Sequence, residues 1–457
     1  MVGLMDKASE LESFILDKIS ETRLPGVSLA VVKDSELIYA RGFGFRDIES
    51  GLPASPDTLY GIGSVTKSFT ALAIMQLVEE GKLSLEDPVE RYVPLKLRPF
   101  KEPVRIHHLL THSSGIPALA YAEAFIRGFL GDPNSWLPVA KPEDVLTFMK
   151  DAEEWAVAKP GEKFFYLNEG YVLLGYIVSK ISGIKYEDYV VQRILKPLDM
   201  HRTFFYGDKA QSDPDKATPY IIDEDKKIIV GRFPHGITSD GGLISNVVDL
   251  SKYISMYLNK GEYKGRRIVA KEYIDMMETP YIEVPFRMFG GEGYGYGWII
   301  TPDFHGRKLV SHSGSVLVYT AYVGYMPEEK IGVAVLANGN GYPPSYIGLY
   351  TLALILGLKA EDLPFLKMER LLKKLEGVYE SYKGTLKAEV KRRNGYLTLG
   401  FKGKYMAREI PLFPEKKEDN VALFYTISGV RKLEVEFRFK EDGVELLYER
   451  YKLVKHS

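Results

Sequence analysis

The sequence predicts an α+β fold. We expect an antiparallel sheet flanked by helices, with an all-helical subdomain, and then a small C-terminal antiparallel β-barrel or sandwich. Two β-rich runs near the N-terminus flank a short polar turn, as in a hairpin. Residues from about 88 to 240 show helical periodicity broken by Pro/Gly loops, and short alternating runs fill residues 377–457. We therefore expect one domain over residues 1–365, with the helical subdomain at about 88–240, and a second domain over 370–457.

The N-terminal elements follow from hydrophobic periodicity. Apolar residues at positions 11, 14, 15 and 19 share one face of an amphipathic helix. Residues 26–32 and 36–40 are rich in β-branched and apolar side chains and predict the two strands of a hairpin. From Ser64 to Glu80 the pattern becomes helical, and it ends at Gly81, a suitable C-terminal cap.

The remaining elements of both domains are predicted in the same way. In the first domain we expect helices at residues 171–181, 186–194, 247–259 and 345–357, and strands at 296–300, 309–310, 320–325 and 332–336. In the second we expect strands at residues 384–390, 394–399, 406–410, 421–425, 432–439 and 444–453. Such a module either serves stability and assembly or binds a ligand, and the sequence leaves both interpretations open.

Composition and charge exclude several classes of function. The 457 residues include 60 Lys+Arg and 61 Asp+Glu, so a formal net charge of -1 gives no reason to expect a nucleic-acid or anionic-membrane partner. Without cysteine the chain has no disulfide, thiolate metal site, iron–sulfur cluster or cysteine nucleophile. The eight histidines lack metal-ligand spacing, so we expect no metal and no cofactor.

The sequence also predicts a cytoplasmic location. The N-terminal segment lacks the basic flank, apolar core and small-residue cleavage site of a signal peptide. The most apolar later run, residues 347–358, is far shorter than the ~20 residues that span a bilayer. The abundance of Lys, Glu and Tyr and the absence of cysteine favour a thermophilic source.

Ser64 and Lys67 are the first candidates for chemistry. A serine three residues before a lysine, at the start of a helix, lies one turn away on the same face, so the lysine side chain can reach the serine Oγ. The helix N-terminus presents free amides and the positive end of its dipole, which favour developing negative charge. A desolvated lysine with a lowered pKa can act as the base that activates the hydroxyl.

The same spacing occurs a second time. Ser182 and Lys185 straddle Gly183, where a helix is expected to end. About two such matches arise by chance in a chain of this length, so the motif alone is weak. Because Ser64 stands at a helix start and Ser182 does not, we interpret Ser64 as the candidate nucleophile.

A tyrosine followed two positions later by an asparagine also occurs twice. Tyr166 and Asn168 lie in a loop before a helix, where a hydroxyl can project into a cleft. Tyr257 and Asn259 lie at the tail of a helix, where a tyrosine usually packs and snorkels. The sequence therefore favours Tyr166 as a functional residue.

The third element is the run Ser-His-Ser-Gly-Ser at residues 311–315. Gly314 lets a substrate backbone approach closely, and the amide of Ser315 could donate to an oxyanion. His312 is interpreted as a polar hydrogen-bonding group poised near neutral pH, with a structural histidine on a strand as the alternative. A similar tract contains His112 but lies in the helical segment, so we interpret it as a structural turn and His112 as lying outside the site.

The order and spacing of these motifs resemble the serine β-lactamase and penicillin-binding-protein superfamily. Ser64-x-x-Lys67 is followed about a hundred residues later by Tyr166-x-Asn168 and finally by His312-Ser-Gly. The match is most similar to the branch of class C β-lactamases, D-aminopeptidases, D-Ala-D-Ala carboxypeptidases and family esterases. The tracts at residues 109–115, 159–161, 239–250 and 294–298 fit as well. The resemblance spans residues from about 10 to about 355 and implies a β-lactamase-like fold, whereas the C-terminal module resembles a lipocalin-type barrel.

The resemblance implies a role for each matching residue. Ser64 would be the acylated nucleophile, and Lys67 its base partner. Tyr166 would pass the proton to the leaving group and then activate water, and Asn168 would bind the substrate amide. The backbone amides of Ser64 and Ser315 would form the oxyanion hole.

His312 departs from the Lys-Thr-Gly that is usual in β-lactamases and carboxypeptidases. In those proteins the lysine is a fixed cation near the substrate carboxylate, and a neutral imidazole weakens that attraction. The His-x-Gly variant is more similar to aminopeptidase and esterase members.

Three functions remain open at this point. The first is a serine peptidase that forms an acyl-enzyme and acts on short peptides or amides containing D-amino acids. The second is a carboxylesterase with the same site, since one nucleophile and oxyanion hole serve amides and esters alike. The third is a non-catalytic binding protein that retains the fold. The expected partners are a small peptide or ester substrate and further copies of the chain, assembled through the C-terminal module.

Overall fold

The structure, a computed structural model, describes residues 7–456 except 133, 136, 138, 140, 206, 208, 209, 211, 235, 237, 394 and 403–406. The predicted strand starts at 394 and 406 therefore lie outside the described residues. The chain divides into two compact units, Met1–Leu358 and Lys359–Ser457. Each unit is described by itself.

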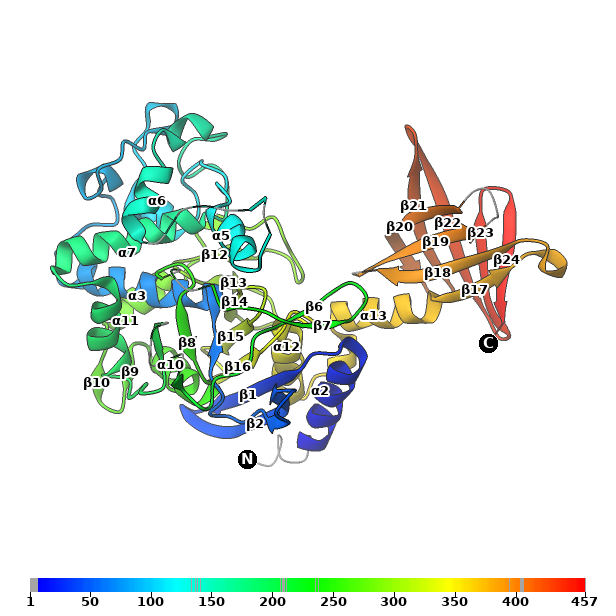
Figure 1. Ribbon diagram of the computed structural model, residues 1–457, viewed down its shortest axis with the longest axis horizontal. Helices are drawn as coiled ribbons and strands as arrows, with labels where there is room; N and C mark the ends of the chain where they lie inside the picture. The colour runs from blue at the N-terminus through cyan, green and yellow to red at the C-terminus, as the bar shows by residue number, and fades with distance from the viewer. Residues whose placement is uncertain are drawn as a thin grey trace. The chain divides into compact units, whose positions relative to one another are not determined.

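An antiparallel sheet forms the centre of the first unit (Figure 1). Within the described residues it has nine strands in the order β11-β12-β13-β14-β15-β16-β1-β2-β3. Their bounds are β1 (Gly26–Lys33), β2 (Glu36–Asp47), β3 (Leu52–Pro53), β11 (Ile282–Glu283), β12 (Gly293–Tyr294), β13 (Ile299–Thr301), β14 (Leu309–Ser315), β15 (Thr320–Met326) and β16 (Ile331–Ala337). The predicted hairpin and the predicted strands from 309 onward are confirmed.

The predicted strand at 296–300 is wrong in its position. The chain turns sharply there, because the amide of Gly295 donates to the carbonyl of Trp298 at 2.8 Å, and β12 pairs back onto β13 across this turn. Apolar and aromatic side chains fill the turn, which therefore resembles a strand in sequence.

Helices cover both faces of the sheet. In the first unit they are α2 (Ala8–Thr22), α3 (Thr66–Glu79), α4 (Ile106–Leu110), α5 (Tyr121–Phe129), α6 (Pro142–Phe148), α7 (Asn168–Ser182), α8 (Tyr186–Val190), α10 (Val247–Leu258), α11 (Lys271–Met277) and α12 (Pro344–Ile355). Strand alternation divides β16 between the two faces. Ala334 and Leu336 share a cluster with Ile254 of α10, whereas Gly348 of α12 meets the Tyr322 ring of the neighbouring strand β15.

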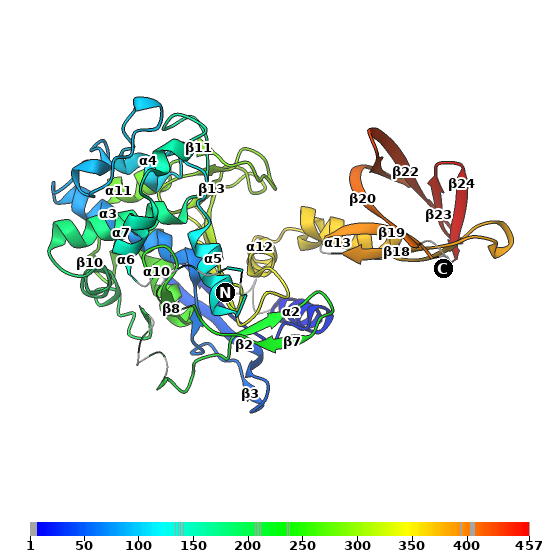
Figure 2. The ribbon, with the colours of Figure 1, turned by 45° about the horizontal axis from the view of Figure 1, so that its top comes forward.

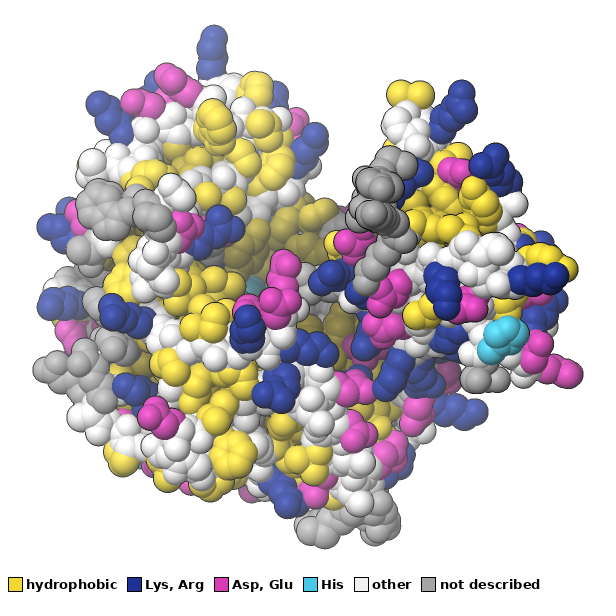
Figure 3. Space-filling view, turned by 45° about the vertical axis from the view of Figure 1, so that its right-hand side comes forward, with side chains coloured by type: hydrophobic (Ala, Val, Ile, Leu, Met, Phe, Trp, Pro, Cys, Tyr) yellow, Lys and Arg dark blue, Asp and Glu magenta, His cyan; other side chains and the backbone are white. Residues whose placement is uncertain are grey.

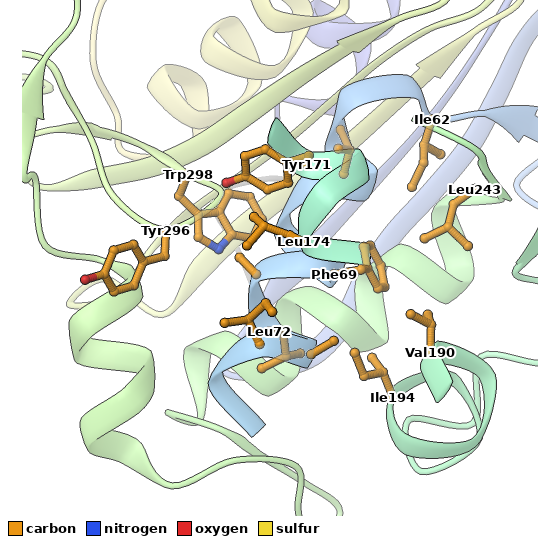
Figure 4. Close-up of a cluster of buried hydrophobic side chains, with 14 of the residues drawn as sticks. Ile62, Phe69, Leu72, Tyr171, Leu174, Val190, Ile194, Leu243, Tyr296 and Trp298 are labelled. Atoms are coloured by element: carbon orange, nitrogen blue, oxygen red, sulfur yellow. The ribbon is translucent and has the colours of Figure 1, made fainter. Parts of the chain in front are cut away.

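The helix α3 runs through the interior and carries the candidate lysine. Twelve of its fourteen residues are buried, so it is apolar on nearly all sides, as expected of a helix enclosed by protein. Phe69 and Leu72 of α3 lie against a cluster that includes Leu174 of α7 and Val190 of α8 (Figure 4). This packing holds the first turn of α3, and the serine before it, in a fixed place.

The segment from about 88 to 240 is mostly helical but not entirely so. It contains α4 to α8, a π-helical turn at Val191–Leu195, and the short strands β5 (Phe204–Phe205), β6 (Tyr220–Ile222) and β7 (Ile228–Val230). Strand β5 pairs with β8 (Leu243–Ser245), which in turn pairs with β4 (Tyr60–Gly61). The prediction of an all-helical subdomain therefore missed strands that are too short to show alternation.

The second unit is a helix followed by a closed antiparallel barrel (Figure 2). Helix α13 (Pro364–Leu375) precedes β17 (Gly377–Glu380), β18 (Lys387–Arg393), β19 (Tyr396–Lys402), β20 (Ala407–Glu418), β21 (Val421–Ser428), β22 (Arg431–Lys440), β23 (Gly443–Tyr448) and β24 (Tyr451–His456). Inward residues alternate with outward ones, and Phe424, Val435 and Phe437 meet in the barrel core. The predicted barrel is confirmed, although its helix and its first strand were not predicted.

The described surface carries charges of both signs. Lys and Arg side chains are interspersed with Asp and Glu on the face that Figure 3 shows, consistent with the net charge of -1. No helix among the described residues combines the length and the apolar character that a membrane span needs.

Candidate active site

Ser64 stands at the entrance to α3. It lies in a short 3-10 turn, Gly63–Val65, that leads directly into the helix, and it is half-buried. The Nζ of Lys67, one helical turn later, lies 3.2 Å from the Ser64 Oγ. The structure thus brings these two predicted residues together as their spacing requires.

Two glycines bring the Ser64 turn against strand β14. Gly63 has φ +50, and a Cβ added there would come within 2.7 Å of the Ser315 amide nitrogen. A Cβ on Gly314 would come within 1.9 Å of the Ile62 carbonyl oxygen. Only glycine permits this approach. It places the backbone amides of Ser64 and Ser315, the two predicted oxyanion donors, on neighbouring segments.

Lys67 is fully buried and its Nζ has three acceptors. Besides Ser64 Oγ, it donates to Asn168 Oδ1 at 2.8 Å and to the carbonyl oxygen of Asp240 at 2.7 Å. These three contacts fit an ammonium that donates to all three oxygens, and they equally fit a neutral amine that donates to two and accepts from the Ser64 hydroxyl. The arrangement fixes the Nζ between the nucleophile and the first residue of α7.

Tyr166 lies beside the Nζ of Lys67. The Lys67 Nζ is 4.9 Å from the centre of the Tyr166 ring, and Tyr166 and Asn168 line the same cleft. The backbone on either side of Tyr166 is tied to His112, because Phe165 N donates to the His112 carbonyl and Leu167 N donates to its Nδ1.

His112 therefore belongs to the surroundings of the site, and interpreting it as lying outside was wrong. Its ring centre is 4.2 Å from that of Tyr166, and its side chain is 1% exposed. The residue has φ +57, and it does end a turn, as expected. The turn, however, is what carries the imidazole beneath Tyr166. Since Nδ1 accepts from Leu167, the ring proton resides on Nε2, and burial holds the pKa of His112 well below its usual range.

His312 is a neutral, fixed hydrogen-bonding group. Its Nδ1 lies 2.6 Å from the carbonyl of Ser313, which can only accept, so Nδ1 donates. Its Nε2 then accepts from the hydroxyl of Tyr294 at 2.9 Å. Burial, and secondarily the charge of Lys67, lower the pKa of His312 to about 3. The expectation that this imidazole is poised near neutral pH is therefore wrong, whereas its place in the cleft wall agrees with the sequence.

A group of buried acids adjoins Lys67. Tyr121, the first residue of α5, donates its hydroxyl to Asp240 Oδ2 at 2.8 Å, and its backbone amide donates to Glu169 Oε1 at 3.0 Å. Asp240 and Glu169 are 2% and 1% exposed. Burial raises the pKa of both carboxyl groups, that of Glu169 to about 7.

The candidate residues open onto a cleft of about 550 Å³. All the predicted site residues except the buried Lys67 line it, and so do residues that the sequence did not single out. The added lining side chains are Ala122, Glu123, Ile126, Arg127, Asp240, Phe286, Ile299, Val316 and Leu317. The cleft is thus mainly apolar, with a few charges on its α5 side.

The second copies of the Ser-x-x-Lys and Tyr-x-Asn motifs do not line this cleft. The hydroxyl of Tyr257 is buried between Tyr253 and the sulfur of Met277, as expected of a packing tyrosine. Ser182 ends α7, and Lys185 precedes α8. Over the part of the chain that the structure describes, no group of three or more acidic or histidine side chains is placed to hold a metal ion.

The site residues that the sequence analysis did not select lie in tracts that it had noted. His112, Tyr294 and Asp240 each lie in a tract that supported the resemblance, at 109–115, 294–298 and 239–250. His112 was interpreted as a structural turn because its segment is in the predicted helical subdomain, whereas Asp240 was not considered individually, because a single acid in a loop has no spacing to test. Their placement depends on contacts between segments over a hundred residues apart in some cases, such as Tyr121 with Asp240.

Comparison with known proteins matches each of the two units to a described family. Residues 7–357 match the family described as Beta-lactamase, and residues 359–454 match the Pab87 octamerisation domain. The solved structure of the octameric penicillin-binding protein homologue from Pyrococcus abyssi is 56% identical and has a TM-score of 0.94, covering 98% of this chain and 100% of that one.

More distant proteins match the first unit. The penicillin binding protein from Bacillus halodurans is 25% identical with a TM-score of 0.61, covering 75% of this chain and 98% of its own. Protein flp of Staphylococcus aureus (strain MW2) is 29% identical over 346 residues, which are 75% of this chain. The matched region spans 65% of the length of Protein flp.

Proposed function

The chain belongs to the β-lactamase family of serine hydrolases, and from that premise we propose that it is a serine peptidase that forms an acyl-enzyme on Ser64 and acts on short peptides or amides containing D-amino acids. The observation that carries the proposal is the set of contacts around Lys67, whose Nζ reaches both Ser64 Oγ and Asn168 Oδ1 at the floor of a cleft. A serine without a role in chemistry would not need a buried lysine within hydrogen-bond distance of its hydroxyl.

In the proposed reaction Lys67 acts as a neutral amine, which donates to Asn168 Oδ1 and to the carbonyl oxygen of Asp240 and keeps its lone pair for the Ser64 hydroxyl. Ser64 Oγ attacks the substrate carbonyl carbon as its proton passes to Lys67 Nζ. The carbonyl oxygen becomes an oxyanion that accepts from the amides of Ser64 and Ser315. Tyr166 then gives its hydroxyl proton to the leaving amine as the C–N bond breaks and takes the proton held by Lys67, which leaves an ester on Ser64 and Lys67 as the neutral amine again. Water attacks this ester as Tyr166 takes a proton from the water and passes its own to the Lys67 amine. Lys67 then returns that proton to Ser64 Oγ as the acid product leaves.

The neutral state of His312 bears on the substrate. A lysine in its place would attract a carboxylate, whereas an imidazole with both nitrogens engaged carries no charge at neutral pH. This supports substrates without a carboxylate next to the scissile bond, and disfavours β-lactams and C-terminal D-amino acids. The same observation supports a carboxylesterase as the second candidate, because the chemistry at Ser64 is common to both.

We also propose that the protein assembles into a homo-oligomer through its second unit. The match of residues 359–454 to an octamerisation domain supports this, as does the octameric state of the Pyrococcus abyssi homologue. Analytical ultracentrifugation of the full chain and of the chain truncated after residue 358 would test it. A monomeric full chain, or an oligomer that survives the truncation, would overturn the assembly proposal.

A panel of matched substrates tests the enzymatic proposal. D-aminoacyl amides, their L counterparts, short D-peptides and simple esters are incubated with the wild type and with Ser64→Ala. The expected result is cleavage of the D-amides or D-peptides by the wild type only. Turnover of esters alone would move the assignment to carboxylesterase, and no turnover of any substrate would favour the binding protein.

A further inference from the structure

A second cavity of the first unit adjoins the catalytic cleft. Its volume is about 350 Å³, within the range of sites that bind small molecules. The walls are aromatic and basic, formed by Phe129, Lys216, Pro219, Gly231, Arg232, Phe233 and Tyr319. No acidic side chain is among these described lining residues. Such a cavity suits a ligand group that combines an apolar part with a negative charge.

The cavity and the cleft share two walls. Helix α5 presents Ile126 to the cleft and, three residues later, Phe129 to the cavity. The tight turn after β14 places Leu317 in the cleft and Tyr319 in the cavity, and the amide of Val316 donates to the Tyr319 carbonyl at 3.0 Å. A substrate chain that follows these walls out of the cleft can therefore continue into the cavity.

The cavity also lies near the candidate nucleophile. A Cβ added to Gly61 would come within 2.4 Å of the Phe233 ring and 3.0 Å of the Tyr319 ring, so both aromatic walls pack against Gly61. Gly61 precedes Ser64 by three residues, which span at most about 11 Å. An extended peptide covers the same distance with about three residues.

The cavity follows the C-terminal end of β14, whereas His312 lies earlier on that strand. In the proposed reaction Tyr166 protonates the leaving amine, and its ring centre is 6.3 Å from that of His312. The leaving group therefore lies toward His312. The oxyanion donor Ser315 and the turn to Tyr319 come later along the chain, so the acyl part of the substrate extends toward the cavity.

Two cations line the cavity, and the acids close to them in the sequence are engaged elsewhere. Arg232 is exposed and has no hydrogen-bond or ion-pair partner among the described residues. Asp213 and Asp215, which precede Lys216, accept from the guanidinium of Arg202 at 2.9 and 3.0 Å. An arginine with free N–H donors can bind a carboxylate through two parallel hydrogen bonds.

We propose that this cavity binds a carboxylate on the acyl side of extended substrates, about three residues before the scissile bond, through Arg232 and Lys216. The inference rests on the proposed hydrolysis at Ser64 and adds a charge preference to it. The aromatic walls hold the apolar part of the extension, and the two cations hold its acidic end. The neutral His312 provides no such preference on the leaving side, so substrate charge is recognised away from the reacting bond.

The test compares two substrates that differ only in charge. Succinyl-tri-D-alanyl p-nitroanilide begins with a carboxylate, and its succinamoyl counterpart begins with a neutral amide of nearly the same size. We expect the wild type to favour the carboxylate in kcat/KM by about fivefold, the effect of one or two partly exposed charge pairs. This charge ratio should approach unity in about 1 M salt, where the Debye length is about 3 Å. It should also approach unity when a single D-alanyl residue replaces the three, because the extension is then too short.

Substitutions of Arg232 test the cavity itself. Arg232→Gln should lower the charge ratio toward unity, and Arg232→Glu should lower it further, because like charges then meet. Turnover of short D-amides, which do not reach the cavity, should stay unchanged in both variants. The matched control is Arg267→Gln, at an exposed arginine of β10 (Arg266–Arg267) that lines neither the cleft nor the cavity.

The outcomes separate this inference from the proposed function. A wild-type charge ratio near unity at low salt would overturn the carboxylate site and leave hydrolysis at Ser64 in place. A ratio that Arg232→Glu leaves unchanged would do the same, and so would turnover of short amides or esters without turnover of either extended compound. No turnover of any amide, peptide or ester would contradict the proposed function itself.

Discussion

The two units of this protein differ most in what they bury. In the first unit the buried residues include charged side chains, among them Lys67, Glu169 and Asp240. In the described part of the second unit, the buried polar residues are the hydroxyl-bearing Thr398 and Thr426, and the core is otherwise apolar. Burying a charge is costly unless it is paired. This difference agrees with the proposed chemistry of the first unit and with the proposed role of the second unit in assembly.

The same difference shows in how the elements are packed. Helix α3 is enclosed on nearly all sides, and its buried face includes a lysine. The barrel strands instead alternate between inward and outward residues, most regularly in β23, whose every second residue is buried. The proposed chemistry therefore depends on the start of one helix, whereas the core of the barrel is shared among its eight strands.

The largest expected effect is the loss of turnover in Ser64→Ala. Without the nucleophile, kcat/KM on any good substrate should fall by at least about 10³-fold, while the free energy of unfolding stays near that of the wild type. Ser182→Ala is the matched control, since it changes the other serine of the same motif at the end of α7. Equal losses in the two variants, or unchanged turnover in Ser64→Ala, would contradict the assignment.

A core substitution in the barrel should affect only stability. Phe437 is fully buried and lies 5.5 Å from Phe424 between ring centres. Phe437→Ala should lower the free energy of unfolding of the second unit by about 3–5 kcal/mol, with turnover per folded catalytic unit unchanged. Phe413→Ala, at a residue that is 39% exposed, should cost much less. If turnover fell together with the free energy of unfolding of the barrel, the activity of the first unit would depend on the second, contrary to this account.

A substitution beneath Tyr166 should affect both stability and activity. His112→Phe keeps a ring against Tyr166 but leaves the amide of Leu167 without its acceptor. Such an unpaired buried amide costs about 1–3 kcal/mol in unfolding free energy, and displacement of Tyr166 should lower kcat more than it raises KM. Denaturant titration and steady-state kinetics would measure both effects. His305→Phe, at an exposed residue, is the control. A normal kcat in His112→Phe would show that His112 does not hold Tyr166 in place for the reaction.

The smallest effect is the acid sensitivity that His312 gives to the first unit. Its pKa is about 3 in the native state and 6.5 for an unperturbed histidine, so below pH 6.5 the unfolded state binds a proton that the native state does not. The free energy of unfolding should therefore fall as pH drops, by about 2 kcal/mol at about pH 5. His312→Gln should show a shallower fall between these pH values than His305→Gln. Equal slopes in the two variants would contradict the neutral, buried state of His312.

The sequence was informative where local pattern decides the structure. Ser64 and Lys67 lie one turn apart where the Gly63–Val65 turn leads into α3, so their spacing alone predicts the contact at 3.2 Å. Tyr166 was distinguished from Tyr257 by its loop context, and the latter is indeed enclosed by the core. The barrel was predicted from the alternation of apolar and polar residues in short runs over residues 377–457. The role of each residue in catalysis remains a prediction.

The sequence was less informative where distant segments meet. His112 reaches Tyr166 across more than fifty residues, and Asp240 meets Tyr121 across more than a hundred. No local period records such contacts. In the barrel, the predicted run at 444–453 is two strands, because Glu449 adopts φ +51 in a tight turn without glycine. A turn built on a non-glycine residue gives little signal.

Mass spectrometry of the trapped intermediate tests the central claim most directly. The wild-type protein is mixed with a D-alanyl ester, quenched in acid within the time of a turnover, digested and mapped. We predict that the peptide containing Ser64 gains the mass of the alanyl group, and that Ser64→Ala gains none. Turnover without this adduct, or an adduct on another serine such as Ser182, would contradict the account.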